Sequence, residues 1–271
     1  MSDVAPIVLI HGLWMTPLSW EGWAERFRAA GHEVVVPGWP GVGPGPEGVD
    51  AVRADPSVLA GLGVKEVADH YETIIRGLDR APIIMGHSFG GLLTQVLLSR
   101  GLGVAGVAIH SAQTRGVMRL PLSTLRAAFP VLKNPLNRGR TVGLTPKQFH
   151  YAFTNSLSAE ESQGVWDRLH IPAPGRPLFQ AGLANFTFGR KWPTSVDYRK
   201  ADRAPLLFIA GGADHIVPAS VNKENAGKYR KAATPAEFRE FDGRTHNVVG
   251  QAGWEEVADY ALSWATSAVG S

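Results

Sequence analysis

The sequence predicts an α/β protein built on a mostly parallel sheet of about six strands, with helices on both faces and a helical cap. Two observations carry this prediction. Short apolar runs alternate with longer amphipathic segments, and one long stretch of helical character interrupts that alternation. The chain has 271 residues, of which 44% are hydrophobic, which suffices for one large domain with a buried core.

The alternation itself places the elements. We expect strands at 7–10, 33–37, 82–85, 104–110, 204–211 and 236–243. Helices are expected at 17–31, 63–78, 90–101, 219–232 and 251–266. The second of these helices has Val64, Val67, Tyr71 and Ile75 on one face. A helix between successive strands implies right-handed crossovers and parallel pairing.

Two segments depart from this pattern. Residues 38–61 are rich in glycine and proline, and we expect a long ordered loop there. Residues 111–200 contain proline-punctuated helical stretches and no convincing strand, and a plain connection of that length is not expected. We interpret 111–200 as an inserted helical cap, with 144–169 as its best helical part. Residues 1–110 and 201–271 would then form the core domain.

Composition excludes several classes of protein. Charged residues make up 19% of the chain, its formal net charge is +3, and no run of five basic residues occurs, so no nucleic-acid partner is expected. The absence of cysteine excludes disulfides, cysteine-based zinc sites and thiol catalysis. The first residues resemble neither a signal peptide nor an anchor, and no apolar run approaches roughly 20 residues. We therefore expect a soluble, cytoplasmic protein with no membrane partner.

Ser88 is the first candidate for chemistry. It stands in Gly86-His87-Ser88-Phe89-Gly90, between an expected strand and an expected helix. A sharp strand-to-helix turn forces its central residue into an unfavourable backbone conformation, and flanking glycines remove the side chains that would clash. The amide of Phe89, at the start of the helix, can donate to a developing oxyanion.

A serine hydroxyl needs a base, and the sequence offers one. Asp214 follows the expected strand 204–211, and His246 lies between the last expected strand and the last helix. Parallel strands end at one edge of a sheet, so Ser88, Asp214 and His246 are expected to converge there. Asp242, four residues before His246, is the alternative acid.

At this point the sequence resembles the α/β-hydrolase superfamily over almost its whole length. "LIHGLW" at 9–14 looks like the His-Gly oxyanion motif, and "GHSFGG" looks like the nucleophile elbow. "PLLFIAGGADHIVP" looks like the acid strand, and "DGRTHNVV" looks like the histidine loop. The order Ser, Asp, His is the order found in that superfamily.

The resemblance implies roles for these residues. Ser88 is the nucleophile, His246 the general base and then the general acid, and Asp214 orients the imidazole. The backbone amides of Leu13 and Phe89 form the oxyanion hole. Members of the superfamily commonly carry a strand hairpin ahead of the His-Gly strand, whereas only ten residues precede His11. We therefore expect a sheet without the first two strands.

The other polar candidates are expected to be structural. His11 is interpreted as ordering the oxyanion loop by hydrogen bonds, and His87 as packed beside the elbow. His110 ends an expected strand, where a hydrogen-bonded structural role and a place facing the pocket both stay open. His215 is expected to point away from Asp214. No cluster of side chains has metal-ligand spacing, so neither a metal nor a cofactor is expected.

The apolar side chains of the cap have two interpretations. Most of them pack the cap against the core domain, while a minority line an apolar acyl or aryl pocket. We expect Trp14, His87, Phe153 and Trp166 among the pocket residues. Spacing alone does not decide which side chains of the cap face inward.

The leading hypothesis is a cofactor-free serine hydrolase that cleaves a carboxylic ester through an acyl-enzyme. An amide or lactone hydrolase, an acyltransferase and a C–C bond hydrolase would use the same triad. From another class, a ligand-binding receptor on the same scaffold stays open. The expected partner is a small-molecule ester or related acyl substrate, and the chain is expected to be a monomer or a homodimer.

Overall fold

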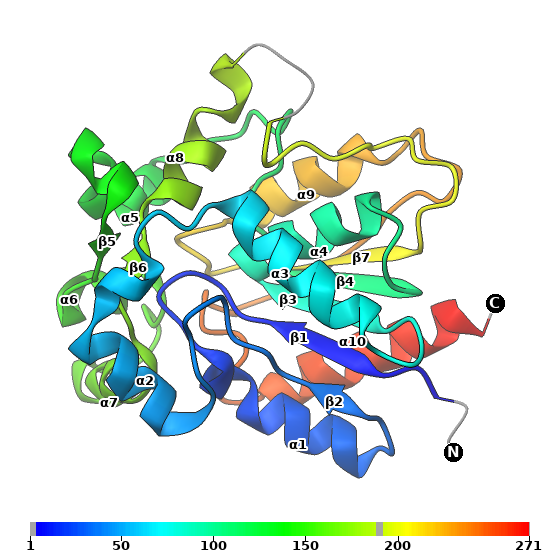
Figure 1. Ribbon diagram of the computed structural model, residues 1–271, viewed down its shortest axis with the longest axis horizontal. Coiled ribbons are helices and arrows are strands. Elements are labelled where there is room, and N and C mark those ends of the chain that lie inside the picture. Colours follow the sequence, from blue (N-terminus) through cyan, green and yellow to red (C-terminus); the bar gives the residue numbers. More distant parts are fainter. Residues whose placement is uncertain (1–3, 188–191, 271) are drawn as a thin grey trace.

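The computed structural model describes residues 4–187 and 192–270 and contains a six-stranded sheet in which every neighbouring pair of strands is parallel (Figure 1). The strand order is β2-β1-β3-β4-β7-β8. The strands are β1 (Ile7–Ile10), β2 (Val34–Val35), β3 (Ile83–His87), β4 (Ala105–Ile109), β7 (Leu206–Gly211) and β8 (Glu237–Phe241). All six expected strands are confirmed, and so is the fold class.

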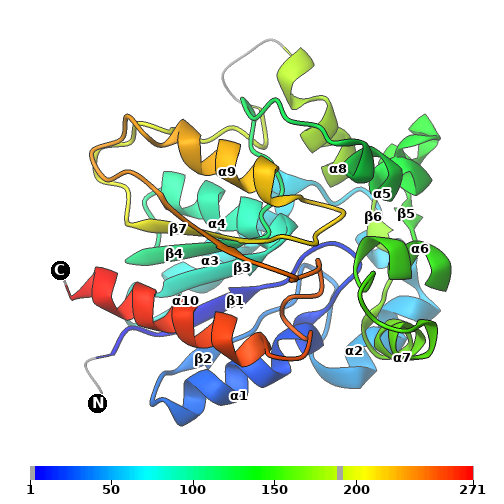
Figure 2. The ribbon, with the colours of Figure 1, turned by 180° about the vertical axis from the view of Figure 1, so that it is seen from behind.

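Helices cover both faces of this sheet. Helices α1 (Glu21–Ala29) and α10 (Trp254–Val269) lie on one face, and α3 (Val64–Arg76), α4 (Phe89–Ser99) and α9 (Ala219–Lys228) lie on the other (Figures 1 and 2). A short 3-10 turn, η1 (Pro17–Trp20), precedes α1. All five expected core helices are therefore present, with ends that differ by a few residues from the expected ranges.

Alternate residues of each strand pack against different helices. Ile7 and Leu9 of β1 belong to the apolar cluster beneath α1 and α10, whereas Val8 and Ile10 belong to the cluster beneath α3 and α4. This division follows from the two-residue period of a strand. Because both faces are covered, the strands read as continuous apolar runs in the sequence.

Residues 38–61 are not a loop throughout, and the expectation of one was wrong. They contain helix α2 (Gly45–Ala54) and the 3-10 turn η2 (Pro56–Leu59). The glycines and prolines that suggested a loop lie largely before and within the first turn of α2, where Pro46 is tolerated because the first helical amides need no partner. At the other end of α2, Arg53 donates to the backbone oxygens of Trp166, Asp167 and His170.

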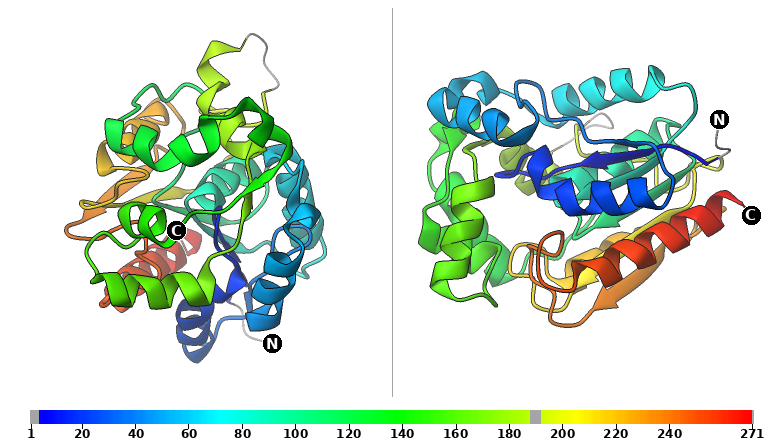
Figure 3. Two further views of the ribbon diagram at one scale, coloured as in Figure 1. Left: turned by 90° about the vertical axis from the view of Figure 1, so that its left-hand side faces the viewer. Right: turned by 90° about the horizontal axis from the view of Figure 1, so that it is seen from below.

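The segment 111–200, called the cap segment below, is largely helical and lies beyond the carboxyl ends of the sheet strands (Figure 3). It contains α5 (Leu122–Leu132), η3 (Pro135–Gly139), α6 (Pro146–Ala152), α7 (Ala159–Leu169), α8 (Arg176–Gly182) and η4 (Ala184–Phe186). Two short strands, β5 (Thr141–Val142) and β6 (Ala173–Pro174), pair antiparallel within it. They are too short to leave a periodic pattern, and the sequence did not predict them.

Two helices of the cap segment start at capping boxes. At α6, the hydroxyl of Thr145 accepts from the amide of Gln148, and the Gln148 side chain accepts from the amide of Thr145. Ser158 and Glu161 repeat this exchange at α7. Within residues 4–187 and 192–270, no helix has the length and apolar character needed to cross a bilayer.

Candidate active site

Ser88 occupies the turn between β3 and α4 with φ 58° and ψ −118°. A non-glycine residue rarely adopts such a conformation, and the surrounding hydrogen bonds hold it there. The amide of Ser88 donates to the oxygen of Ile109, 2.9 Å away, and its own carbonyl accepts from the amides of Gly91, Leu92 and Ala112. The turn is therefore strained and tied to the neighbouring strand β4.

The glycines around Ser88 allow this turn to pack closely. A Cβ on Gly90 would lie 2.0 Å from the oxygen of Ile10, and one on Gly86 would lie 2.1 Å from the oxygen of Gly90. Neither position has room for a side chain, because the obstructing atoms are backbone. The G-x-S-x-G pattern is thus required by the packing of the turn itself.

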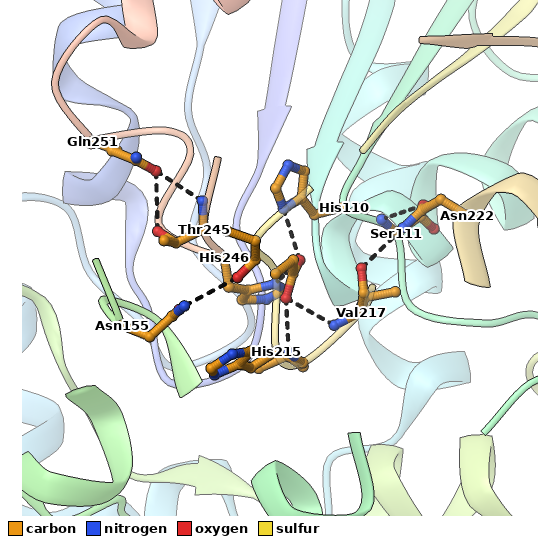
Figure 4. Close-up of polar contacts among 12 residues, drawn as sticks. His110, Ser111, Asn155, His215, Val217, Asn222, Thr245, His246 and Gln251 are labelled. Atoms are coloured by element: carbon orange, nitrogen blue, oxygen red, sulfur yellow. Dashed lines mark hydrogen bonds and ion pairs between the residues drawn. The ribbon is translucent and has the colours of Figure 1, made fainter. Parts of the chain in front are cut away.

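Asp214 and His246 meet at the same edge of the sheet, as the sequence predicts. Asp214 follows β7, His246 follows β8, and Nδ1 of His246 lies 2.7 Å from Oδ2 of Asp214 (Figure 4). Both side chains are buried. The alternative acid, Asp242, lies at the exposed end of β8, and Asp214 is the carboxylate that bonds His246.

His110 is a further member of this site. The sequence placed it at the end of a strand but did not predict a hydrogen bond to Asp214. Its Nδ1 lies 2.7 Å from the same Oδ2 of Asp214 (Figure 4). The other oxygen, Oδ1, accepts from the amides of Ile216 and Val217 at 2.7 and 2.9 Å. His110 has a left-handed backbone with φ 45°, and its ring points toward Asp214. The sequence does not show which way the His110 ring points, so it could not predict this contact.

These hydrogen bonds determine the charge of the site. Burial acts to raise the pKa of Asp214, but the interaction with His246 and the hydrogen bonds from His110 and His246 outweigh it and hold that pKa well below its usual range. The carboxylate is therefore ionised and accepts only, so each imidazole carries its proton on Nδ1. Burial lowers the pKa of His110, which is consequently neutral. The Nε2 atom of His246 is buried and has no hydrogen-bond partner among the described residues.

Contacts with the cap segment and the last loop fix the position of His246. Its neighbour Asn247 donates from the backbone to the oxygen of Phe153, 3.0 Å away. Thr245, on the other side, donates from its amide and its hydroxyl to the Gln251 side chain (Figure 4). The ring of Phe153 meets the His246 imidazole edge to face, with centroids 4.9 Å apart. His246 thus sits between the sheet and the cap segment.

His11 holds the loop after β1. Its Nδ1 lies 2.9 Å from the oxygen of Gly12, and its Nε2 accepts from the backbone amide of Trp39. Since Nε2 is the acceptor, Nδ1 carries the proton. Burial lowers the pKa of His11 to about 4, so the ring is neutral. These contacts agree with the expectation that His11 orders this loop.

The same loop approaches Ser88. A Cβ on Gly12 would lie 2.7 Å from Cβ of Ser88, so only glycine lets the loop reach the serine. The next residue, Leu13, is buried. Within the described ranges, the amides of Leu13 and Phe89 donate to no acceptor, which leaves both available for a ligand.

A cavity of about 320 Å³ opens above Ser88 and Phe89. Its walls come from the loop after β1, from α5 and α8 of the cap segment, and from the loop after β7. The lining side chains are almost all apolar, and they include Trp14, Ala112, Leu125, Ala128, Leu178, Phe179, Ile216 and Val217. Gln113 and Thr124 add polar atoms, and within residues 4–187 and 192–270 no charged side chain lines the cavity.

Of the four side chains expected in the pocket, Trp14 lines the cavity and the other three lie elsewhere. His87 is buried beneath Ser88, with its ring centroid 4.7 Å from that of His246. Phe153 stacks on Phe149 with centroids 4.6 Å apart. Trp166 stacks on His170, and its Nε1 donates to the oxygen of Leu144. His215 bonds the backbone of the cap segment and takes no part in the Asp214 network.

His87, His110 and His246 form a compact group of imidazoles. One nitrogen from each ring lies within 4.8 Å of the others, a spacing that would suit a metal ion if all three were free. Asp214 uses Nδ1 of both His110 and His246, however. Within the described residues, these imidazoles therefore belong to a hydrogen-bonded network centred on the Asp214 carboxylate. A cation there would have to replace one of the hydrogen bonds to Asp214 or bind the free Nε2 of His246.

The chain matches the family model described as the alpha/beta hydrolase family over residues 7–260. It belongs to the α/β-hydrolase family. The match covers the whole sheet and the cap segment. It agrees with the order of the four motifs in the sequence.

Solved structures with the same fold are similar to this chain throughout. They include a monoacylglycerol lipase from Paleococcus ferrophilus (21% identity, TM-score 0.66, covering 97% of this chain and 96% of that one). An extracellular alpha/beta-hydrolase from a Paenibacillus species shares 18% identity, with a TM-score of 0.68 and 97% and 99% coverage. A thermophilic esterase from Thermogutta terrifontis shares 17% identity, with a TM-score of 0.67 and 99% and 92% coverage. No curated protein matches the chain.

Proposed function

We propose that this α/β-hydrolase is a serine hydrolase that cleaves a carboxylic ester through an acyl-enzyme, with Ser88, His246 and Asp214 as its triad. The observation that carries the proposal is the Asp214–His246 hydrogen bond next to a strained serine turn. The bond holds the proton on Nδ1 of His246 and leaves Nε2 as a base. Solved relatives with this fold include a lipase and an esterase, which agrees with ester chemistry.

In this mechanism the Ser88 hydroxyl attacks the ester carbonyl and transfers its proton to Nε2 of His246. The amides of Leu13 and Phe89 hold the oxyanion of the tetrahedral intermediate. His246 then protonates the leaving alcohol, and the acyl group stays on Ser88. A water molecule, activated by the same nitrogen, releases the acid by the reverse steps. Asp214 remains ionised and stabilises the imidazolium in both halves.

The cavity supports an apolar acyl or aryl group as the substrate moiety. The described residues that line it carry no charge, so a charged substituent would lose its hydration without gaining a partner among them. A volume of about 320 Å³ accommodates about ten methylene-sized groups at roughly 30 Å³ each. We therefore propose esters of medium-length acyl chains or aromatic acids.

Amide and lactone hydrolysis, acyl transfer and C–C bond hydrolysis would use the same triad. A receptor role would also use the cavity, but it would not require φ 58° at Ser88 or the hydrogen bond between Asp214 and His246. Backbone strain of that kind clusters at active sites, where the surrounding structure holds it in place. The Ser88 geometry therefore favours the enzyme over the receptor.

Labelling with a fluorophosphonate probe tests the proposal. We expect modification of Ser88, hydrolysis of p-nitrophenyl butyrate by the wild-type chain, and loss of both in Ser88→Ala. Ser267→Ala, on α10 and remote from the site, is the matched control and should keep both. A folded wild-type chain that is not labelled at Ser88 would overturn the proposed function.

A further inference from the structure

Helix α5 turns an apolar face to solvent. Leu122, Leu125 and Phe129 lie on one side of the helix at spacings of three and four residues, and they are 84%, 40% and 62% exposed. A helix in a soluble protein normally buries such a face. The exposed face therefore points to a partner that covers it.

The apolar surface extends beyond α5. Helix α8 and the turn η3 both pack against α5; the exposed Leu183 directly follows α8, and the exposed Leu136 lies in η3. Of the eleven exposed large apolar side chains in the described ranges, eight lie between residues 118 and 186. We call the central six the apolar rim: Leu120, Leu122, Leu125, Phe129, Leu136 and Leu183.

Positively charged residues are concentrated in the stretch of chain that carries five of the six rim residues. The chain has no aspartate or glutamate from residue 80 to residue 159, and residues 111–159 carry seven lysines and arginines. The rest of the chain holds 20 basic and 24 acidic residues, so the excess positive charge is concentrated here. Six of the seven are exposed and form no ion pair with any described residue: Arg119, Arg126, Lys133, Arg138, Arg140 and Lys147.

The rim also forms part of the cavity. Leu120, Leu125 and Leu183 belong to the exposed rim and line the cavity above Ser88 at the same time. An apolar molecule that leaves a partner at the rim can therefore enter the cavity without first crossing water. Helices α5 and α8 lie at the end of the molecule away from the two termini (Figures 1 and 2), so a broad flat partner meets no obstruction from them.

We propose that the apolar rim and the exposed cations of residues 111–159 dock this protein on an anionic lipid surface. The six apolar side chains insert among the acyl chains, and the lysines and arginines contact anionic headgroups, as in an interfacial amphipathic helix. A second copy of the chain fits less well, because a two-fold contact would oppose the cations of one rim to those of the other. Docking on lipid goes beyond the proposed function, because it concerns the surface of the protein and not its chemistry. It also differs from the expectation, drawn from the sequence, that the protein has no membrane partner.

Vesicle binding tests the docking independently of catalysis. The Ser88→Ala chain is sedimented with vesicles of phosphatidylcholine alone or with added phosphatidylglycerol, at low and at high salt. We expect binding at least about tenfold tighter to the anionic vesicles. High salt should weaken that binding. Binding that is absent, or equal on both vesicles and indifferent to salt, would overturn the proposal.

Two double variants separate the apolar and ionic contributions. Leu122→Ser with Phe129→Ser should weaken vesicle binding by at least about tenfold, because two inserted side chains are lost. Lys133→Glu with Arg138→Glu should weaken binding to anionic vesicles by at least about fivefold for each position and leave neutral vesicles unaffected. The matched controls are Val269→Ser, an exposed apolar side chain at the C-terminal end, and Lys231→Glu, an exposed cation beyond α9. Both controls should bind like the parent chain.

Sedimentation equilibrium of the same chains addresses the other partners. A dimer that the Leu122→Ser, Phe129→Ser pair dissociates, in a chain that ignores vesicles, would replace the lipid surface by a second copy. Failure of both double variants to reduce vesicle binding would place the contact elsewhere on the molecule. A wild-type chain that binds anionic vesicles but is not labelled at Ser88 would refute the proposed function and leave the docking intact.

Discussion

The imidazole of His110 lies 2.7 Å from Oδ2 of Asp214, on the oxygen that His246 also uses. Two imidazole rings therefore share one acceptor, and His110 does not line the cavity above Ser88. Its effect on the reaction passes through the carboxylate, because each donor stabilises the ionised form of Asp214. We regard His110 as a positioning residue for the proposed triad.

Replacing His110 tests that role. In His110→Leu the Nδ1 donor is lost, and we expect kcat/KM to fall roughly tenfold, since a hydrogen bond to a charged group contributes about 1.5 kcal/mol or more. The acidic limb of the pH profile should move to higher pH, because a carboxylate with one donor fewer favours the protonated form of its remaining partner. A purely structural role would lower activity without moving that limb.

His110→Asn and His110→Gln serve as matched controls for the same position. Asparagine tolerates the left-handed backbone at φ 45° and carries a donor near the place of Nδ1, so it should restore both the rate and the pH profile. Glutamine carries its donor at the place of Nε2, too far along the side chain, and should resemble leucine. Equal behaviour of the two amides would contradict the assignment.

Asp214→Asn should be more damaging than its size suggests. All four groups facing the Asp214 carboxylate are donors: two imidazoles on Oδ2 and two backbone amides on Oδ1. The NH2 group of an asparagine would face either the two imidazoles or the two backbone amides, which are donors themselves. Either arrangement disturbs the hydrogen bond that orients the His246 ring. We expect kcat to fall by about 10⁴-fold, a loss of the size found for the equivalent change in serine proteases. Asp242→Asn, at an exposed position, should leave kcat within about twofold.

Gly12→Ala tests the closeness of the oxyanion loop to the nucleophile. The added methyl would lie 2.7 Å from Cβ of Ser88 and 3.0 Å from the oxygen of His87, so the loop must retreat. We expect kcat/KM for a p-nitrophenyl ester to fall by about 100-fold, because an oxyanion donor is displaced. Gly164→Ala, inside α7 with no atom within 4 Å of its Cβ, should retain activity and gain about 1 kcal/mol of stability.

The cavity offers a test of substrate size. Ala128 lies on α5 and lines the cavity, so Ala128→Phe fills part of it. We expect kcat/KM for p-nitrophenyl decanoate to drop by at least about tenfold while p-nitrophenyl acetate is affected much less. Ala29→Phe, at the exposed end of α1, is the matched control and should change neither. A uniform loss across chain lengths would show that the acyl group lies elsewhere.

Much of this site follows from the sequence because strand ends in a parallel sheet converge. The apolar runs and the chain order predict that Ser88, Asp214 and His246 follow strands that end at one edge of the sheet, and this prediction needs no knowledge of side-chain directions. The bond between His110 and Asp214 could not be predicted in this way, since it depends on the left-handed backbone of one residue. The sequence correctly placed His110 at the end of β4, but it did not show which residue His110 would bond.

Two other differences between the expected and the observed structure also arise from local packing that composition does not show. Helix α2 was hidden because glycine and proline at a helix start resemble a loop in composition. Trp166 is one of the large apolar residues of the cap segment, yet its ring stacks on His170 and its indole nitrogen bonds Leu144. A helix that packs on neighbours along several sides carries apolar residues on each of them, so periodicity does not tell which side faces the cavity.

The stability of the fold at low pH should depend on His11. Burial lowers its pKa to about 4 in the folded chain, whereas an unfolded histidine titrates near 6.5. Between these values the unfolded state binds more protons, so the contribution of His11 is fully present above pH 6.5 and is lost as the pH falls toward 4. The change amounts to about 3 kcal/mol for a fully buried ring. In His11→Asn, which keeps a donor near Gly12 but has no titrating group, urea unfolding should show lower stability than wild type at pH 7.5 and a smaller loss between pH 6.5 and pH 4. An unchanged pH dependence in His11→Asn would show that other groups control the acid limit of the fold.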